Sequence, residues 1–134
     1  MSDPFEQLVF RAARYTDRRA WEELSLLFVE EGRLTRPSDP ANPILGRANI
    51  LASLCKRPPR TTRHLISNVI ITQHSATTAS ISSLVTLFSG AEGTGKVGRI
   101  EKMAIGNFDD EVLWCGDAWR FLERGGSISL ESDI

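Results

Sequence analysis

The chain has 134 residues, a length typical of one domain, and its 41% hydrophobic and 25% charged residues are ordinary globular proportions. These values exclude disordered, fibrous and membrane-embedded classes. The formal net charge of -1 gives no long-range attraction to phosphate backbones, so we expect no nucleic-acid partner.

No apolar run is long enough for a secretion signal or a membrane span, because the chain becomes amphipathic directly after Pro4. We therefore expect no membrane partner and a cytoplasmic location. Residues 1–134 are expected to form one domain, since no linker-like composition interrupts them.

Three helices are predicted in the first half of the chain. Asp3 and Pro4 have the form of a helix start, and the apolar period from Phe5 fades at Asp17. Residues 21–32 carry a second apolar stripe that ends at Gly32. A third helix follows Gly46 and stops before residues 58–59, and the proline-rich loop at 37–43 is placed to cover a pocket.

The rest of the chain has the composition of strands. A brief strand is predicted at 33–36 and longer ones at 61–72, 79–88, 99–109 and 119–124, with a glycine-rich hairpin connection at 89–98. Helices followed by a strand meander predict an α+β fold, with the helices packed on one face of a curved antiparallel sheet.

His64 is the main candidate for chemistry. Strand alternation places it on one face with Thr62, Ile66 and Asn68, among apolar neighbours. A neutral imidazole there can act as general acid or base, provided that an acceptor fixes its protonated nitrogen. Asp17, at the end of the first helix, is the candidate acceptor.

A structural explanation of these residues stays open. His64 can be a core histidine bonded to a backbone carbonyl, and Asp17 can cap the helix that follows it. Tyr15 can donate to a substrate oxygen, and Trp21 and Phe28 can line an apolar pocket, but all three residue types also serve as ordinary core.

Other charged groups do not indicate a site. Asp109, Asp110 and Glu111 are expected at the exposed end of a strand, and with no ligands of fixed spacing we expect no metal. The segment from Arg57 to Arg60, with Arg63 behind it, is expected to be a solvated loop.

Several segments, in order, resemble the SnoaL-like domains of the nuclear transport factor two superfamily. They are residues 14–17 with Trp21, Leu27, Phe28 and Gly32, then Gly46 with Ile50, residues 62–69, residues 106–109, and residues 119–121 with Arg124. The resemblance implies a cone-shaped sheet around a pocket for a small apolar ligand, no cofactor, and a homodimer or homotrimer. The superfamily includes scytalone dehydratase, ketosteroid isomerase, polyketide cyclases and the β subunits of aromatic-ring dioxygenases.

Asp17 and His64 match a pair that, in scytalone dehydratase, assists the loss of water from an alicyclic substrate. This sequence departs from scytalone dehydratase at two places. Thr16 stands where that enzyme has a pocket tyrosine, and no residue near 104–107 matches the enzyme's second pocket histidine. The resemblance therefore implies a lyase or isomerase in which Tyr15 and Asn68 bind substrate oxygen. The alternatives are a non-catalytic subunit that partners an enzyme α chain, and a ligand-binding module.

Overall fold

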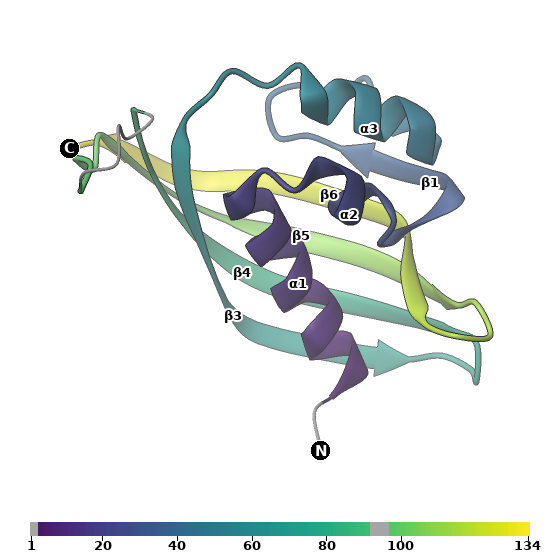
Figure 1. The fold of residues 1–134 in the computed structure, drawn as a ribbon. Coiled ribbons are helices and arrows are strands. Elements are labelled where there is room, and N and C mark those ends of the chain that lie inside the picture. The colour runs from purple at the N-terminus through teal and green to yellow at the C-terminus, as the bar shows by residue number, and fades with distance from the viewer. Residues whose placement is uncertain (1–2, 92–96) are drawn as a thin grey trace.

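One curved sheet and three helices make up the computed structural model, which describes residues 3–91 and 97–134 (Figure 1). The helices lie together on one face of the sheet. In chain order the elements are α1 (Pro4–Arg18), α2 (Trp21–Ser25), β1 (Phe28–Thr35), β2 (Ile44–Leu45), α3 (Arg47–Cys55), β3 (Thr61–Gln73), β4 (Thr78–Gly90), β5 (Lys102–Trp114) and β6 (Trp119–Asp133). The predicted α+β class is confirmed.

The strand order in the sheet is β2-β1-β6-β5-β4-β3. Strands β3 to β6 form the predicted antiparallel meander. Strand β1 lies parallel to β6, so the first long strand of the chain pairs with the last. The predicted antiparallel sheet did not include this parallel pairing.

Helix α1 begins as predicted. The Asp3 carboxylate accepts hydrogen bonds from the backbone N–H groups of Phe5 and Glu6, and Pro4 occupies the first turn. The helix ends at Arg18, and its C-cap residue Arg19 has a φ of 57°, in the left-handed region. The apolar face of α1 packs into one core with residues from the other helices and the sheet, namely Phe5, Leu8, Val9, Ala12, Leu24, Phe28, Ile50, Leu54, Ala79, Ile81, Val112 and Phe121.

The second predicted helix is too long. Helix α2 ends at Ser25, and Phe28 begins β1, which continues through Gly32. Phe28 and Val29 are both buried in this strand, and Phe28 pairs with Phe121 of β6. The tertiary pairing overrides the local helical period. Gly32 is needed for close approach instead, because a Cβ there would lie 2.9 Å from the carbonyl oxygen of Val29.

A bulge changes the inward face of β3. Three steps along β3, from Ser67 to Ile70, match two along β4, and Asn68 between them has a φ of 52°. Before the bulge Thr62, His64 and Ile66 are the less exposed residues, and after it Val69 and Ile71 are. The predicted shared face of His64 and Asn68 is therefore wrong, since Asn68 is exposed.

The last strands are longer than predicted. Strand β5 runs to Trp114, so residues 109–111 lie within it and not at an exposed end. Asp110 is 2% exposed. The hairpin connection predicted at 89–98 overlaps residues 92–96, which lie outside the described residues. Among the helices in the described ranges, none is long and apolar enough to cross a membrane.

Candidate active site

A cavity of about 440 Å³ lies between the inward face of the sheet and the helices. Its walls are largely apolar, with side chains from α2, α3 and the strands: Trp21, Leu24, Phe28, Leu34, Leu54, Val85, Leu87, Ala104, Phe108 and Ile128. Exposed residues at 37–38, 58 and 60 also line it, so the cavity opens to solvent there. We call this opening the mouth; the predicted covering loop at 37–43 contributes Pro37 and Ser38 to it.

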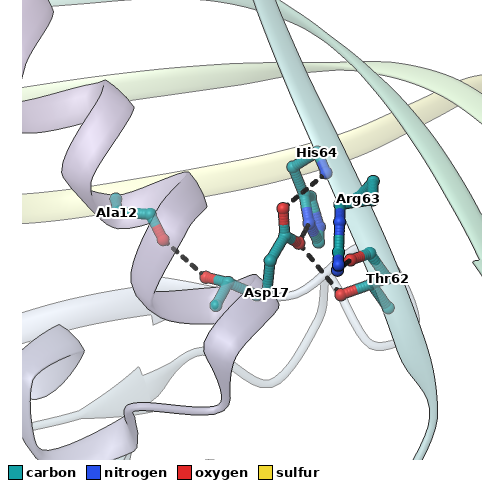
Figure 2. A network of polar contacts seen from close by, with 6 residues as sticks. Ala12, Asp17, Thr62, Arg63 and His64 are labelled. Carbon is teal, nitrogen blue, oxygen red and sulfur yellow. Dashed lines mark hydrogen bonds and ion pairs between the residues drawn. The ribbon is translucent and has the colours of Figure 1, made fainter. Parts of the chain in front are cut away.

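Asp17 reaches from the end of α1 to β3 and holds His64, a lining residue of the cavity (Figure 2). The Asp17 Oδ1 atom lies 2.6 Å from His64 Nδ1 and accepts a hydrogen bond of 2.9 Å from the Thr62 hydroxyl. Oδ2 accepts a hydrogen bond of 2.9 Å from the backbone N–H of His64. One carboxylate therefore fixes both the imidazole and the strand that carries it.

This contact determines the tautomer of His64. An ionised carboxylate only accepts hydrogen bonds, so Nδ1 must carry the proton that it donates to Asp17. The neutral ring then has its lone pair on Nε2. Within residues 3–91 and 97–134, no hydrogen bond engages Nε2, which leaves it available to a molecule in the cavity.

The ionised state of Asp17 is favoured by its hydrogen bonds. Burial by itself raises the pKa of this carboxyl, but the hydrogen bonds from the His64 side chain and backbone and from Thr62 outweigh it, so the pKa lies below 3.8. The side chains of His64 and Asp17 are only 13% and 11% exposed. The pair is therefore largely shielded from water, with the ionised Asp17 carboxylate as the hydrogen-bond acceptor.

The structural alternatives for the two residues are wrong in their details. His64 Nδ1 contacts a carboxylate and not a backbone carbonyl. Asp17 does not cap the following helix, because the N-cap of α2 is Ala20 and no side chain bonds there. Both Asp17 oxygens are directed at β3 instead.

The other predicted site residues divide into two groups. Trp21 and Phe28 line the cavity, as expected for pocket aromatics. In the described part of the chain, Tyr15 and Asn68 are not among the lining residues. Tyr15 packs against the hydrophobic core, and Asn68 is exposed at the bulge. Both are therefore poorly placed to bind a substrate oxygen.

Sequence analysis missed a buried ion pair beside the cavity. Arg124 Nε of β6 lies 3.2 Å from Asp110 Oδ1 of β5, and the Arg124 guanidinium lies 3.7 Å from the ring centroid of Phe108. Burial raises the pKa of Asp110 to about 6, although the charge of Arg124 acts in the opposite direction. Arg124 lines the cavity. Asp110 could have been recognised as inward-facing, because side chains alternate along a strand and Val112, two positions on, is buried.

The segment after α3 is not a plain solvated loop. Arg57 is half-buried, and both Arg57 and Arg60 line the cavity mouth. Arg19 and Arg36 line it as well. The expectation for Arg57 is therefore wrong, because the folded chain brings this segment against α1 and the end of β1.

The described side chains do not bring together the ligands that a metal ion needs. No group of three or more His, Cys, Asp or Glu side chains suited to a metal ion occurs within the described residues. Cys55 and Cys115 are both free and exposed. The expectations of no metal and no cofactor stay predictions.

The fold and the site define a class of protein: a small α+β domain whose curved sheet and helices enclose a cavity, with an aspartate-held histidine in the wall. The chain belongs to the SnoaL-like domain family, whose model matches residues 5–125. The family resemblance drawn from the sequence is thus confirmed. No curated protein matches the sequence.

Solved structures share the fold at low sequence identity. A candidate scytalone dehydratase from Novosphingobium aromaticivorans is 24% identical over 98% of this chain and 85% of that one, with a TM-score of 0.81. A type 2 hexachlorocyclohexane dehydrochlorinase, LinA, is 14% identical over 98% and 86%, also with a TM-score of 0.81. An NTF2-like protein with a cystatin-like fold, also from N. aromaticivorans, is 18% identical over 93% and 79%, with a TM-score of 0.72.

Proposed function

We propose that the chain is a cofactor-independent lyase or isomerase that acts on a small, mostly apolar, oxygenated ring compound. The observation that carries this proposal is the contact between Asp17 and His64 in the wall of a largely apolar cavity of about 440 Å³. The names of two similar structures, a dehydratase and a dehydrochlorinase, denote elimination reactions and support a lyase.

His64 moves the proton in this reaction. Its Nε2 takes a proton from the ring carbon next to a carbonyl group. The C–H electrons form a double bond to the carbonyl carbon, and the carbonyl π electrons move to the oxygen, which gives an enolate. In a dehydration the C=O bond of the enolate re-forms and the carbon–carbon double bond shifts to the β-carbon. The bond to the β-hydroxyl group breaks, and the hydroxyl takes the proton from Nε2 and leaves as water. In an isomerisation Nε2 returns the proton to another ring carbon.

Asp17 supports both directions of this transfer. Its carboxylate keeps Nδ1 protonated before the reaction and stabilises the imidazolium after Nε2 has taken the proton. It does not itself change protonation state. Asp17 is therefore a positioning residue, and its hydrogen bond with Thr62 helps to keep the carboxylate in place.

Arg124 is the proposed partner of the substrate carbonyl oxygen. It lines the same cavity as His64, and its Nη2 atom is buried with no hydrogen-bond partner in the described chain. A guanidinium donor in a water-poor site stabilises the negative charge that develops on a carbonyl oxygen during enolisation. Arg124 thus takes the role first expected of Tyr15 and Asn68.

The test is turnover of cyclic β-hydroxyketones, beginning with 3-hydroxycyclohexanone and 3-hydroxy-1-tetralone. The products, a conjugated enone and a naphthol, absorb in the ultraviolet and report the rate directly. We expect His64→Ala to lower kcat by about 10²-fold to 10⁴-fold while the circular dichroism spectrum stays that of the wild type.

The matched control is His74→Ala, because His74 is the other histidine, is exposed and lies in the turn before β4. This variant should keep full activity. Unchanged turnover in His64→Ala would end the proposed mechanism. Ligand binding by the wild type without any product would favour the ligand-binding module instead.

A further inference from the structure

Four arginine side chains meet at the mouth of the cavity. Arg19 comes from the end of α1, Arg36 follows β1, and Arg57 and Arg60 follow α3. We call this set the arginine cluster. Within the described residues, no carboxylate forms an ion pair with any of its members.

Two members of the arginine cluster, Arg19 and Arg57, are held in place by uncharged partners. Arg19 donates hydrogen bonds of 2.8 and 3.1 Å to the backbone carbonyls of Arg57 and Pro58. The guanidinium carbons of Arg19 and Arg57 lie 5.1 and 5.6 Å from the ring centroid of Trp21. Because Trp21 also lines the cavity, these contacts hold both cations at the mouth.

Holding these like charges together is electrostatically unfavourable. Burial lowers the pKa of Arg57, and the positive charges of Arg60, Arg36 and Arg19 lower it further. The Nε atom of Arg36 is buried and has no hydrogen-bond partner in the described part of the chain. An anion at the mouth would relieve the repulsion and supply the missing acceptor.

We propose that the arginine cluster binds a carboxylate carried by the ring compound, so that the substrate class is an aromatic or alicyclic carboxylic acid. The inference rests on the proposed function only in taking the ring as the cavity's occupant. A carboxylate matches the planar fork of a guanidinium and accepts two parallel hydrogen bonds from it. The apolar ring then extends from the mouth into the cavity that His64 lines.

The inference is tested by isothermal titration calorimetry with two ligands that share one ring system, one of them anionic and the other neutral. The probes are 2-naphthoate and 2-naphthamide, which have the same ring and nearly the same shape but differ in charge. We expect naphthoate to bind at least about tenfold more tightly, with an affinity that falls as sodium chloride is added.

Substitutions then assign the difference to the arginine cluster. Arg57→Gln and Arg36→Gln should each weaken naphthoate binding by about tenfold and leave naphthamide binding unchanged. Arg57→Lys should recover part of the loss, because it keeps the charge but not the fork. Arg63→Gln is the matched control, since Arg63 is an exposed arginine of β3 that does not line the cavity.

Equal affinity for the two probes, or no binding of either, would overturn the inference. So would naphthoate binding that is insensitive to both glutamine variants. Inorganic phosphate that binds alone as tightly as naphthoate would also overturn it, because the cluster would then hold a free anion. These outcomes are all independent of whether His64 turns over a β-hydroxyketone, so they leave the proposed chemistry to its own test.

Discussion

Asp17 and His64 are 47 positions apart in the sequence, and in the folded chain a single carboxylate contacts both the ring and the backbone of the histidine. The 2.6 Å contact with Nδ1 sets the tautomer, while the 2.9 Å contact with the backbone N–H sets the position of β3 against the end of α1. Asp17 therefore links the chemistry of the cavity to the packing of the helix on the sheet.

Changing the acceptor to an amide should stop proton transfer. In Asp17→Asn the side-chain NH₂ group can donate to Nδ1, which moves the ring proton to Nε2 and removes the lone pair from the cavity. We expect kcat for the β-hydroxyketones to fall by about 10²-fold to 10⁴-fold. Asp109→Asn, at an exposed position of β5, is the control and should retain wild-type kcat.

Asp17 should also contribute to stability in a pH-dependent manner. Its pKa is lowered below 3.8 in the folded chain, so its contribution to the free energy of unfolding is fully present above pH 3.8 and is lost as the pH falls below that value. Urea unfolding of the wild type and Asp17→Asn measures this contribution. The difference between the two should shrink below pH 3.8, and a difference that grows there would contradict the assignment.

The pair of Asp110 and Arg124 should behave as a buried ion pair. Arg124→Met leaves the Asp110 carboxyl buried without its partner and should cost about 3–5 kcal/mol of stability. The double variant Asp110→Val, Arg124→Met has no buried charge and should be clearly more stable than Arg124→Met alone. A urea-unfolding double-mutant cycle gives the coupling, and additive effects would show that the two side chains act independently.

The bulge in β3 predicts that position 68 favours residues that tolerate a positive φ. Because the φ of Asn68 is 52°, a β-branched side chain is strained there, and Asn68→Val should cost about 1–2 kcal/mol. Asn68→Gly should stay within about 1 kcal/mol of the wild type. Ser67→Val, at the neighbouring exposed position, is the control, and equal thermal stability of the two valine variants would argue against the bulge.

The outer face of the sheet is the proposed surface for a homodimer or homotrimer. Strand register aligns Leu65, Thr86, Ile105 and Leu130 in one row, and Leu65 and Leu130 are 57% and 66% exposed. Light scattering after size exclusion should show an oligomer that Leu65→Lys converts to monomer. Leu26→Lys, at an exposed position outside the sheet, should have no effect, and a monomeric wild type would remove the proposal.

The elements that the sequence predicted well have strong local signals. Helix α1 has the cap at Asp3 and a long apolar period, and the strands β3 and β4 have runs of β-branched residues. The first part of β1, up to Gly32, was predicted as helix because Phe28 continues the spacing of the preceding helix, whereas the strand predicted at 33–36 overlaps the end of β1. Its partner is β6, and a contact between the two ends of the chain leaves no local pattern.

The site could be predicted only in part for a similar reason. Asp17 and His64 were recognisable by residue type, but one extra residue in β3 reversed the face of Asn68. The arginine cluster joins three segments that are distant in sequence, so its convergence depends on the complete fold. From the sequence alone, Arg57 and Arg60 resemble any charged loop beside prolines.

The parallel pairing of β1 with β6 also determines when the cavity can form during synthesis. Strand β1 (Phe28–Thr35) is synthesised before the other strands of the sheet, whereas its long neighbour β6 (Trp119–Asp133) is synthesised after all of them. Until then the meander β3 to β5 has an unsatisfied edge, and the wall that carries Arg124 does not exist. Such non-local closure slows folding, and a nascent chain that stops before Trp119 exposes apolar surface with no ligand chamber.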